Sequence, residues 1–188
     1  TVSNLSIIVN RISYILDLHG PSLTVDTACS SALVALHLAC EDLRTGKISQ
    51  AIAGGVNILL APYAFVGFSK ARMLSPDGRC RVFDASGNGY VRSEGGGAVL
   101  LKPLSQALRD NNRIMALIAG TGLNSDGRTT GIALPNGEAQ AALLEDIYRR
   151  YSLDKSKVVY VEAHGTGTAA GDPVEANSIG SVIGLALK

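Results

Sequence analysis

Short apolar segments alternate with longer helical patterns along this sequence, and this alternation limits the folds that the chain can adopt. Residues 22–27 predict a strand, and residues 30–44 (SSALVALHLACEDLR) predict a helix that ends near Gly46. Because this helix is apolar nearly all round in its first turns, we expect it to be buried. Residues 51–60 and 91–101 predict two more strands.

The second part of the chain repeats the pattern. Residues 114–120 and 158–163 predict strands, and residues 137–151 (GEAQAALLEDIYRRY) predict an amphipathic helix. Asp172 as N-cap, with Pro173 and Glu175 after it, predicts the start of a last helix that continues to the end of the sequence. Two α/β halves of similar build are therefore expected.

Composition narrows the class of protein. The sequence is 46% hydrophobic and 18% charged, which is typical of one globular domain. Its 17 basic and 16 acidic residues give a net charge of +1 and form no basic run, so we expect neither a nucleic acid nor a membrane surface as partner. Gly54, Gly55, Asn57 and Pro62 interrupt the longest weakly polar stretch, residues 51–68, which we interpret as core.

The three cysteines are far apart in the sequence. Cys29, Cys40 and Cys80 predict neither a disulfide framework nor a zinc site, and we expect no bound metal or cofactor and a reducing, cytoplasmic location. No Met opens the chain and no signal-peptide pattern is present, so we expect a fragment.

Cys29 follows a predicted strand and precedes the apolar helix. A helix N-terminus favours the thiolate over the thiol, and the amide of Cys29 is available to an oxyanion formed when the thiol attacks a thioester. Strand, sharp turn, nucleophile and helix are the parts of a nucleophile elbow, although no GxSxG is present. An inert core cysteine is the alternative interpretation.

His164 follows a predicted strand and enters a turn rich in Gly and Thr. A neutral imidazole at this place can donate a hydrogen bond to a developing enolate oxygen, and the hydroxyls of Thr166 and Thr168 suit an extended polar substrate. A histidine that only stabilises the turn is the alternative.

These two stretches resemble the motifs of a known family. VDTACSSALVALHLA is similar to the active-site signature of beta-ketoacyl synthases, and EAHGTGTAAGDPVEA is similar to the motif with the first of that family's two active-site histidines. Four further segments resemble ketosynthase domains of type I polyketide synthases in the same order: NRISYILDLHGPS, AGGVNILLAP, GFSKARMLSPDGRCRVFDASGNGYVRSEGGGAVLLK and LNSDGRTTGIALPNGEAQ.

The resemblance implies a fold, a domain division and a reaction. The fold is the thiolase-like layered α/β sandwich of two similar halves, truncated here at both ends and usually paired as a homodimer. Residues 1–112 are then the latter part of the N-terminal half, and residues 113–188 the start of the C-terminal half. Cys29 takes the acyl chain from an acyl carrier protein, His164 assists decarboxylation of a malonyl-type extender, and Thr166 and Thr168 contact its phosphopantetheine arm.

The resemblance also implies that the sequence lacks catalytic parts. A lysine and a second histidine of the family lie beyond Lys188, and neither His19 nor His37 replaces that histidine. We therefore expect the fragment alone to be inactive. Alternatives are the ketosynthase of a type I fatty acid synthase, a non-condensing docking or dimerisation protein of the same fold, and an unrelated thiol hydrolase that uses Cys29 and His164.

Three other features have simpler interpretations. Cys40 lies about three turns beyond Cys29 on the same helix, which excludes a disulfide between them and indicates a core position. Cys80, between two arginines, is expected to be incidental. The SEGGG run at Gly95 lacks the Lys-Ser/Thr of a phosphate loop and predicts close backbone packing.

Overall fold

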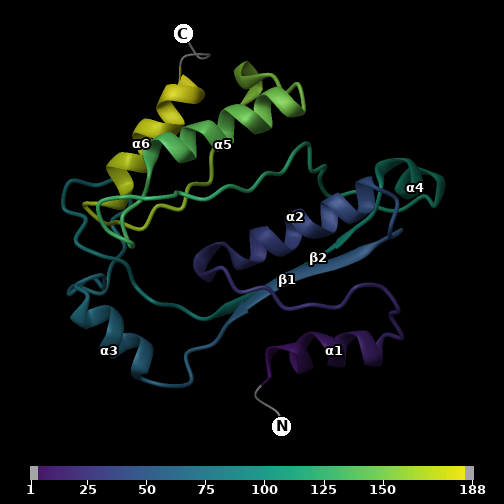
Figure 1. Cartoon of the computed structure of the whole chain (residues 1–188), viewed down its shortest axis with the longest axis horizontal. Helices are drawn as coiled ribbons and strands as arrows, with labels where there is room; N and C mark the ends of the chain where they lie inside the picture. The colour runs from purple at the N-terminus through teal and green to yellow at the C-terminus, as the bar shows by residue number, and fades with distance from the viewer. Residues whose placement is uncertain (1–3, 185–188) are drawn as a thin grey trace. The chain divides into compact units, whose positions relative to one another are not determined.

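The computed structural model describes residues 4–184, shown in Figure 1. These residues form two compact units, each of which is described by itself. The first unit comprises Thr1–Val56 and Gly95–Leu117, and the second comprises Asn57–Glu94 and Ile118–Lys188.

A strand pair and a helix next to it organise the first unit. Strands β1 (Ala51–Asn57) and β2 (Gly95–Leu101) form a two-stranded sheet. Helix α2 (Ser31–Arg44) packs on β1, because a Cβ added to Gly55 would lie 2.8 Å from the Cβ of Ala32 in its first turn. Glycine in the strand therefore permits the close approach of this helix. The unit also contains α1 (Leu5–Ile15), η1 (Ala28–Ser30) and α4 (Leu104–Arg109).

A helix pair organises the second unit. Helix α5 (Gly137–Arg150) begins at the N-cap Asn136, whose side chain accepts from the amides of Glu138 at 3.1 Å and Ala139 at 3.3 Å. Helix α6 (Gly171–Val182) contacts the start of α5, where the Ser178 hydroxyl donates to the carbonyl of Gly137 at 3.0 Å. Helix α3 (Tyr63–Lys70) and the 3-10 turn η2 (Lys155–Lys157) complete the unit.

Three of the predicted strands are absent from the described part of the chain. Residues 22–27, 114–120 and 158–163 have no assigned strand, whereas β1 and β2 form within the predicted ranges. A strand needs a hydrogen-bonded neighbour, and the only sheet in residues 4–184 is the pair β1 and β2. These three strand predictions are therefore wrong, because the apolar pattern carries no information about the neighbour that a strand needs.

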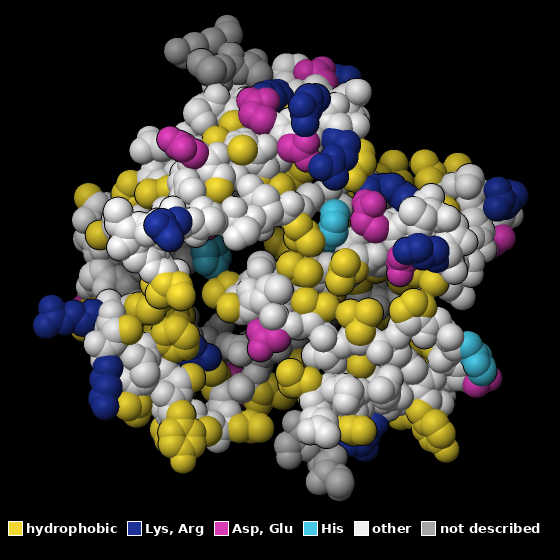
Figure 2. Space-filling view, viewed as in Figure 1, with side chains coloured by type: hydrophobic (Ala, Val, Ile, Leu, Met, Phe, Trp, Pro, Cys, Tyr) yellow, Lys and Arg dark blue, Asp and Glu magenta, His cyan; other side chains and the backbone are white. Residues whose placement is uncertain are grey.

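The expected burial of α2 is also wrong. Cys40 is its only buried residue among those described, and Leu33 is 68% exposed. Apolar exposure is general: Val159 is 99% exposed, and the accessible surface of 13522 Å² exceeds the roughly 8,500 Å² expected for a compact protein of this mass. Figure 2 shows apolar side chains scattered over the viewed face. An all-round apolar helix indicates burial only where a second layer covers its outer side.

No helix in residues 4–184 combines the length and the apolar character that a membrane span requires.

Candidate functional site

Cys29 is the middle residue of a tight turn that leads into a helix. The turn is η1, and α2 follows it directly at Ser31. Ala28, just before the cysteine, has a φ of +57°, a conformation that is uncommon for a residue with a side chain. Cys29 is exposed and forms no disulfide. The predicted strand before the turn is missing, but the sharp turn and the helix after it are present.

Polar side chains of the DTACSS motif hold this turn in place. The Asp26 carboxylate accepts from the amide of Ala28 at 3.0 Å, and the Ser31 hydroxyl accepts from the amide of Thr27 at 2.9 Å. Ser31 also donates to the carbonyl of Ala28 at 2.7 Å, and the hydroxyls of Thr27 and Ser30 lie 2.9 Å apart. These side chains satisfy backbone groups of a strained turn and leave the thiol of Cys29 at its surface.

His164 begins a loop of the second unit that is fixed by a carboxylate of α6. Glu175 accepts from the amide of His164 at 2.7 Å and from the amide of Gly165 at 2.8 Å, one bond to each of its oxygens. The side chain of His164 is exposed. Gly165 and Gly167 have φ values of +53° and +69°, which glycine adopts without strain. The Glu175 carboxylate and the two glycine conformations therefore fix the backbone of this loop.

Thr166 and Thr168 lie together in this loop. Their hydroxyl oxygens are 2.9 Å apart, and Thr168 accepts from the amide of Gly171 at 3.0 Å. A Cβ added to Gly171 would lie 2.8 Å from the hydroxyl oxygen of Thr168 and 2.9 Å from that of Thr166. Only glycine leaves room for both hydroxyls at this point.

Asp172 does not have the predicted role of an N-cap. The N-cap of α6 is Ala170, whose side chain makes no capping bond, and Asp172 lies inside the first turn. Its carboxylate, on a residue that is only 7% exposed, accepts from the amide of Gly167 at 3.0 Å and from the amide of Phe83 at 2.6 Å. Glu175 likewise binds amides of the His164 loop. The sequence predicted that Asp172 and Glu175 cap the start of the helix, but both carboxylates accept from backbone amides outside it.

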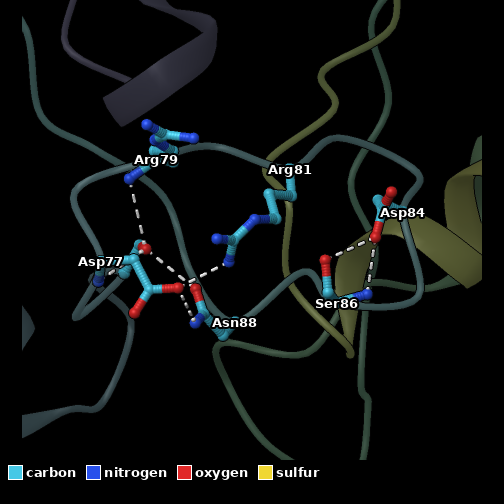
Figure 3. Close-up of polar contacts among 7 residues, drawn as sticks. Asp77, Arg79, Arg81, Asp84, Ser86 and Asn88 are labelled. Carbon is cyan, nitrogen blue, oxygen red and sulfur yellow. Dashed lines mark hydrogen bonds and ion pairs between the residues drawn. The ribbon is translucent and has the colours of Figure 1, made fainter.

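A second loop, residues 75–89, lies against the His164 loop. The amide of Gly89 donates to the carbonyl of Gly167 at 3.0 Å. Within the second loop, Asp77 accepts from Arg81 at 2.6 Å and from Asn88 at 3.1 Å, as Figure 3 shows. The hydrogen bonds from these two side chains hold the pKa of Asp77 below its ordinary value of 3.8. The motifs had assigned residues 75–89 no role in the site, although their alternation of Asp, Arg, Ser and Gly could have indicated a polar network.

The remaining histidines and cysteines lie at positions that indicate no catalytic role. His19 is exposed and lies 3.1 Å from the carboxylate of Asp17, and His37 lies half-buried on α2. Cys40 is 8% exposed and belongs to the core as predicted, and burial raises the pKa of its thiol. Cys80 is exposed, and its sulfur accepts from the amide of Val91 at 3.0 Å. Cys29 lies in the first unit, and the loop with His164 and both threonines lies in the second.

Two family profiles match the sequence in succession. The profile "Beta-ketoacyl synthase, N-terminal domain" matches residues 1–107, and "Beta-ketoacyl synthase, C-terminal domain" matches residues 115–186. This chain belongs to the beta-ketoacyl synthase family. The resemblance inferred from the motifs is therefore confirmed.

Curated relatives of this ketosynthase chain are large polyketide synthases. It is 55% identical over 180 residues to a phenolphthiocerol/phthiocerol polyketide synthase of Mycobacterium tuberculosis, covering 96% of this chain and 10% of the relative. It is 56% identical over 178 residues to the polyketide synthase component of the lovastatin nonaketide synthase of Aspergillus terreus, covering 93% of this chain and 6% of the relative. The chain thus spans a tenth or less of either relative.

Solved ketosynthases have the same fold. The ketosynthase from module 6 of the bacillaene synthase of Bacillus subtilis 168 matches with a TM-score of 0.96 and 43% identity, over 98% of this chain and 33% of that one. An oxazolomycin ketosynthase domain from Streptomyces albus JA3453 matches with a TM-score of 0.94 and 44% identity, over 97% and 32%. The predicted thiolase-like α/β fold is therefore confirmed, and the chain spans about a third of either ketosynthase.

Proposed function

We propose that this chain is part of a beta-ketoacyl synthase of polyketide biosynthesis that joins an acyl group to a malonyl-type unit by decarboxylative Claisen condensation. The observation that carries the proposal is the strained turn at Cys29, in which the neighbouring side chains bind backbone and the thiol remains exposed. The identities of 53–56% to polyketide synthases support this class over a fatty acid synthase.

Cys29 is the proposed nucleophile of the first half-reaction. Its thiolate attacks the carbonyl carbon of an acyl thioester, a new C–S bond forms, and the bond to the carrier's pantetheine sulfur breaks. Cys29 lies in η1, which leads directly into α2, and the backbone amides at this helix start are the proposed donors to the oxyanion of this step. The acyl group is then held on the enzyme while the carrier leaves.

His164, Thr166 and Thr168 are the proposed residues of the second half-reaction. The threonine hydroxyls bind the phosphopantetheine arm that presents the malonyl group, and the His164 imidazole donates a hydrogen bond to the enolate oxygen. The bond to the malonyl carboxylate breaks, carbon dioxide leaves, and the electron pair forms the enolate. The enolate carbon attacks the Cys29 thioester, and the thiolate of Cys29 is released.

The proposed partners follow from this reaction. Acyl and malonyl groups arrive on the phosphopantetheine of an acyl carrier protein, and the enzyme itself holds no cofactor. The working enzyme is a homodimer whose other catalytic groups come from residues outside this sequence, so the chain alone is inactive.

The test uses a complete ketosynthase that carries this chain, either the natural protein or the bacillaene module 6 ketosynthase with its matching third replaced by residues 1–188. After incubation with an acyl thioester, mass spectrometry of the peptides locates the acyl group. We expect the acyl mass on Cys29 and its absence from Cys29→Ala. Cys80→Ala, which removes the other exposed thiol, is the matched control and retains acylation.

Three outcomes separate the alternatives. Chase of the adduct to a longer ketoacyl product only when malonyl carrier protein is added supports condensation. Release as the free acid without malonyl carrier indicates a thiol hydrolase. A folded protein without acylation at Cys29 leaves a docking or dimerisation role.

A further inference from the structure

Gly167, between the two threonines, lies in a slot formed by the backbone of the 75–89 loop. It is buried, and its carbonyl accepts from the amide of Gly89 at 3.0 Å. A Cβ added to Gly167 would lie 3.0 Å from the amide nitrogen of Arg81 and 3.3 Å from the carbonyl oxygen of Gly89. Residues 81 and 89 are therefore the two walls of the slot.

One carboxylate oxygen joins the two walls. The Oδ2 of Asp77 accepts from Nη1 of Arg81 at 2.6 Å and from Nδ2 of Asn88 at 3.1 Å, and Asn88 immediately precedes Gly89. Asn88 is held from its other end too, because its Oδ1 lies 2.8 Å from the hydroxyl of Ser75. Asp77 thus links the side chain of Arg81 in one wall to that of Asn88 beside the other (Figure 3).

The slot has no spare room. A Cβ on Gly87 would lie 2.9 Å from the carbonyl oxygen of Gly167 and 3.0 Å from that of Arg81. Phe83, in the same loop, is tied to the His164 loop through Asp172, which accepts from the amides of both Phe83 and Gly167. Movement of a wall therefore displaces Gly167 and the threonines on either side of it.

We propose that Asp77 is a positioning residue for the carrier arm, because it fixes the slot that holds Gly167 and so places the hydroxyls of Thr166 and Thr168. This inference rests on the proposed roles of those threonines in binding phosphopantetheine. Asp77 acts through the loop backbone and does not touch the substrate.

The test compares Asp77→Asn with Asp146→Asn in the complete ketosynthase. Asp146 is the matched control, since it is an aspartate of the second unit whose carboxylate likewise accepts from two side chains, those of Arg149 and Arg150, but it lies on α5 and outside the slot. We expect Asp77→Asn to raise KM for malonyl carrier protein about three- to tenfold, because a small misplacement of binding groups weakens a productive complex. Acylation of Cys29 and the melting temperature stay as in Asp146→Asn.

A second pair of variants covers the case in which Asp77→Asn does not fold. Arg81→Met is expected to raise the same KM, and Arg81→Lys, which keeps a cation for Asp77, to restore it. An unchanged KM in Arg81→Met and Asp77→Asn overturns the inference. A parallel loss of Cys29 acylation overturns it as well, because the loop is then only structural.

Failure of the proposed function gives a different result. If Thr166→Ala with Thr168→Ala leaves KM for malonyl carrier protein unchanged, the threonines do not bind the arm and both proposals fall. If that double variant raises KM but Asp77→Asn does not, only the positioning role of Asp77 is refuted.

Discussion

Gly171→Ala is the substitution that most directly tests the threonine pair. The added methyl would lie 2.8 Å from the hydroxyl oxygen of Thr168 and 2.9 Å from that of Thr166, closer than Cβ contacts normally come. Neither hydroxyl can rotate away without loss, because Thr168 accepts from the amide of Gly171 and the two hydroxyls bond to each other. The methyl therefore displaces the pair.

The size of the effect follows from the bonds that are lost. Two neutral hydrogen bonds at about 1 kcal/mol each are lost. Replacing glycine by alanine in a helix returns up to about 1 kcal/mol. We expect a net fall of about 1 kcal/mol in the free energy of unfolding. A hydroxyl moved away from the carrier arm loses about 1.4 kcal/mol of binding, which is a tenfold rise in KM for malonyl carrier protein.

Gly180→Ala is the control on the same helix. Apart from its chain neighbours and the backbone of its own helix, no atom lies within 4 Å of a Cβ added there, so this variant is expected to keep KM and to gain stability. The assay is steady-state condensation by the complete ketosynthase at varied malonyl carrier protein, with acylation of Cys29 followed separately by mass spectrometry. A Gly171→Ala enzyme with the KM of Gly180→Ala would refute the assignment of Thr166 and Thr168.

Three further predictions concern the loops and helix starts. Glu175→Gln loses a charged acceptor for the amides of His164 and Gly165. Decarboxylation of malonyl carrier protein, measured as released carbon dioxide, should therefore slow about tenfold, with acylation of Cys29 unchanged. An unaltered rate would contradict the role of Glu175 in holding the His164 loop. Asn136→Ala removes the N-cap of α5 and should lower the free energy of unfolding in urea by about 1 kcal/mol without changing KM, and an unchanged midpoint would count against the cap. The hydrogen bonds from Arg81 and Asn88 hold the pKa of Asp77 below 3.8, so its stabilising contribution is complete above about pH 5 and is lost as the pH falls through the lowered value. Over this acid range, the free energy of unfolding in urea should fall less in Asp77→Asn than in the parent, and identical acid profiles would refute this.

Local patterns predicted the two longest described helices well, whereas α1, α3 and α4 were not predicted. The predicted helices 30–44 and 137–151 correspond to α2 at Ser31–Arg44 and α5 at Gly137–Arg150. Helix periodicity and caps are local, so the sequence contains the information that sets them. The strand predictions for residues 22–27, 114–120 and 158–163 were wrong because a strand also needs a neighbour, which the local pattern does not specify.

The sequence predicted which residues form the candidate site, but it did not predict the hydrogen bonds that hold those residues in place. The motifs identified Cys29 and His164 and the threonines, whose catalytic roles stay predictions. The long-range bonds of Asp172 to Phe83 and of Gly167 to Gly89 join segments about 80 to 90 residues apart, and no periodic pattern connects such positions. Asp172 shows the difficulty: its place beside Pro173 suits an N-cap, but its carboxylate accepts from the amides of Phe83 and Gly167, which belong to two different loops.

The most direct test of the central claim follows the carbon atoms of the extender. The complete ketosynthase, acylated on Cys29, is mixed with malonyl carrier protein that carries carbon-13 in its free carboxylate and at its central carbon. The account predicts that the carboxylate label leaves as carbon dioxide and that the central label appears in a ketoacyl carrier product, in proportion to the loss of the Cys29 adduct. Loss of the adduct as free acid, with both labels still on the malonyl group, would contradict it.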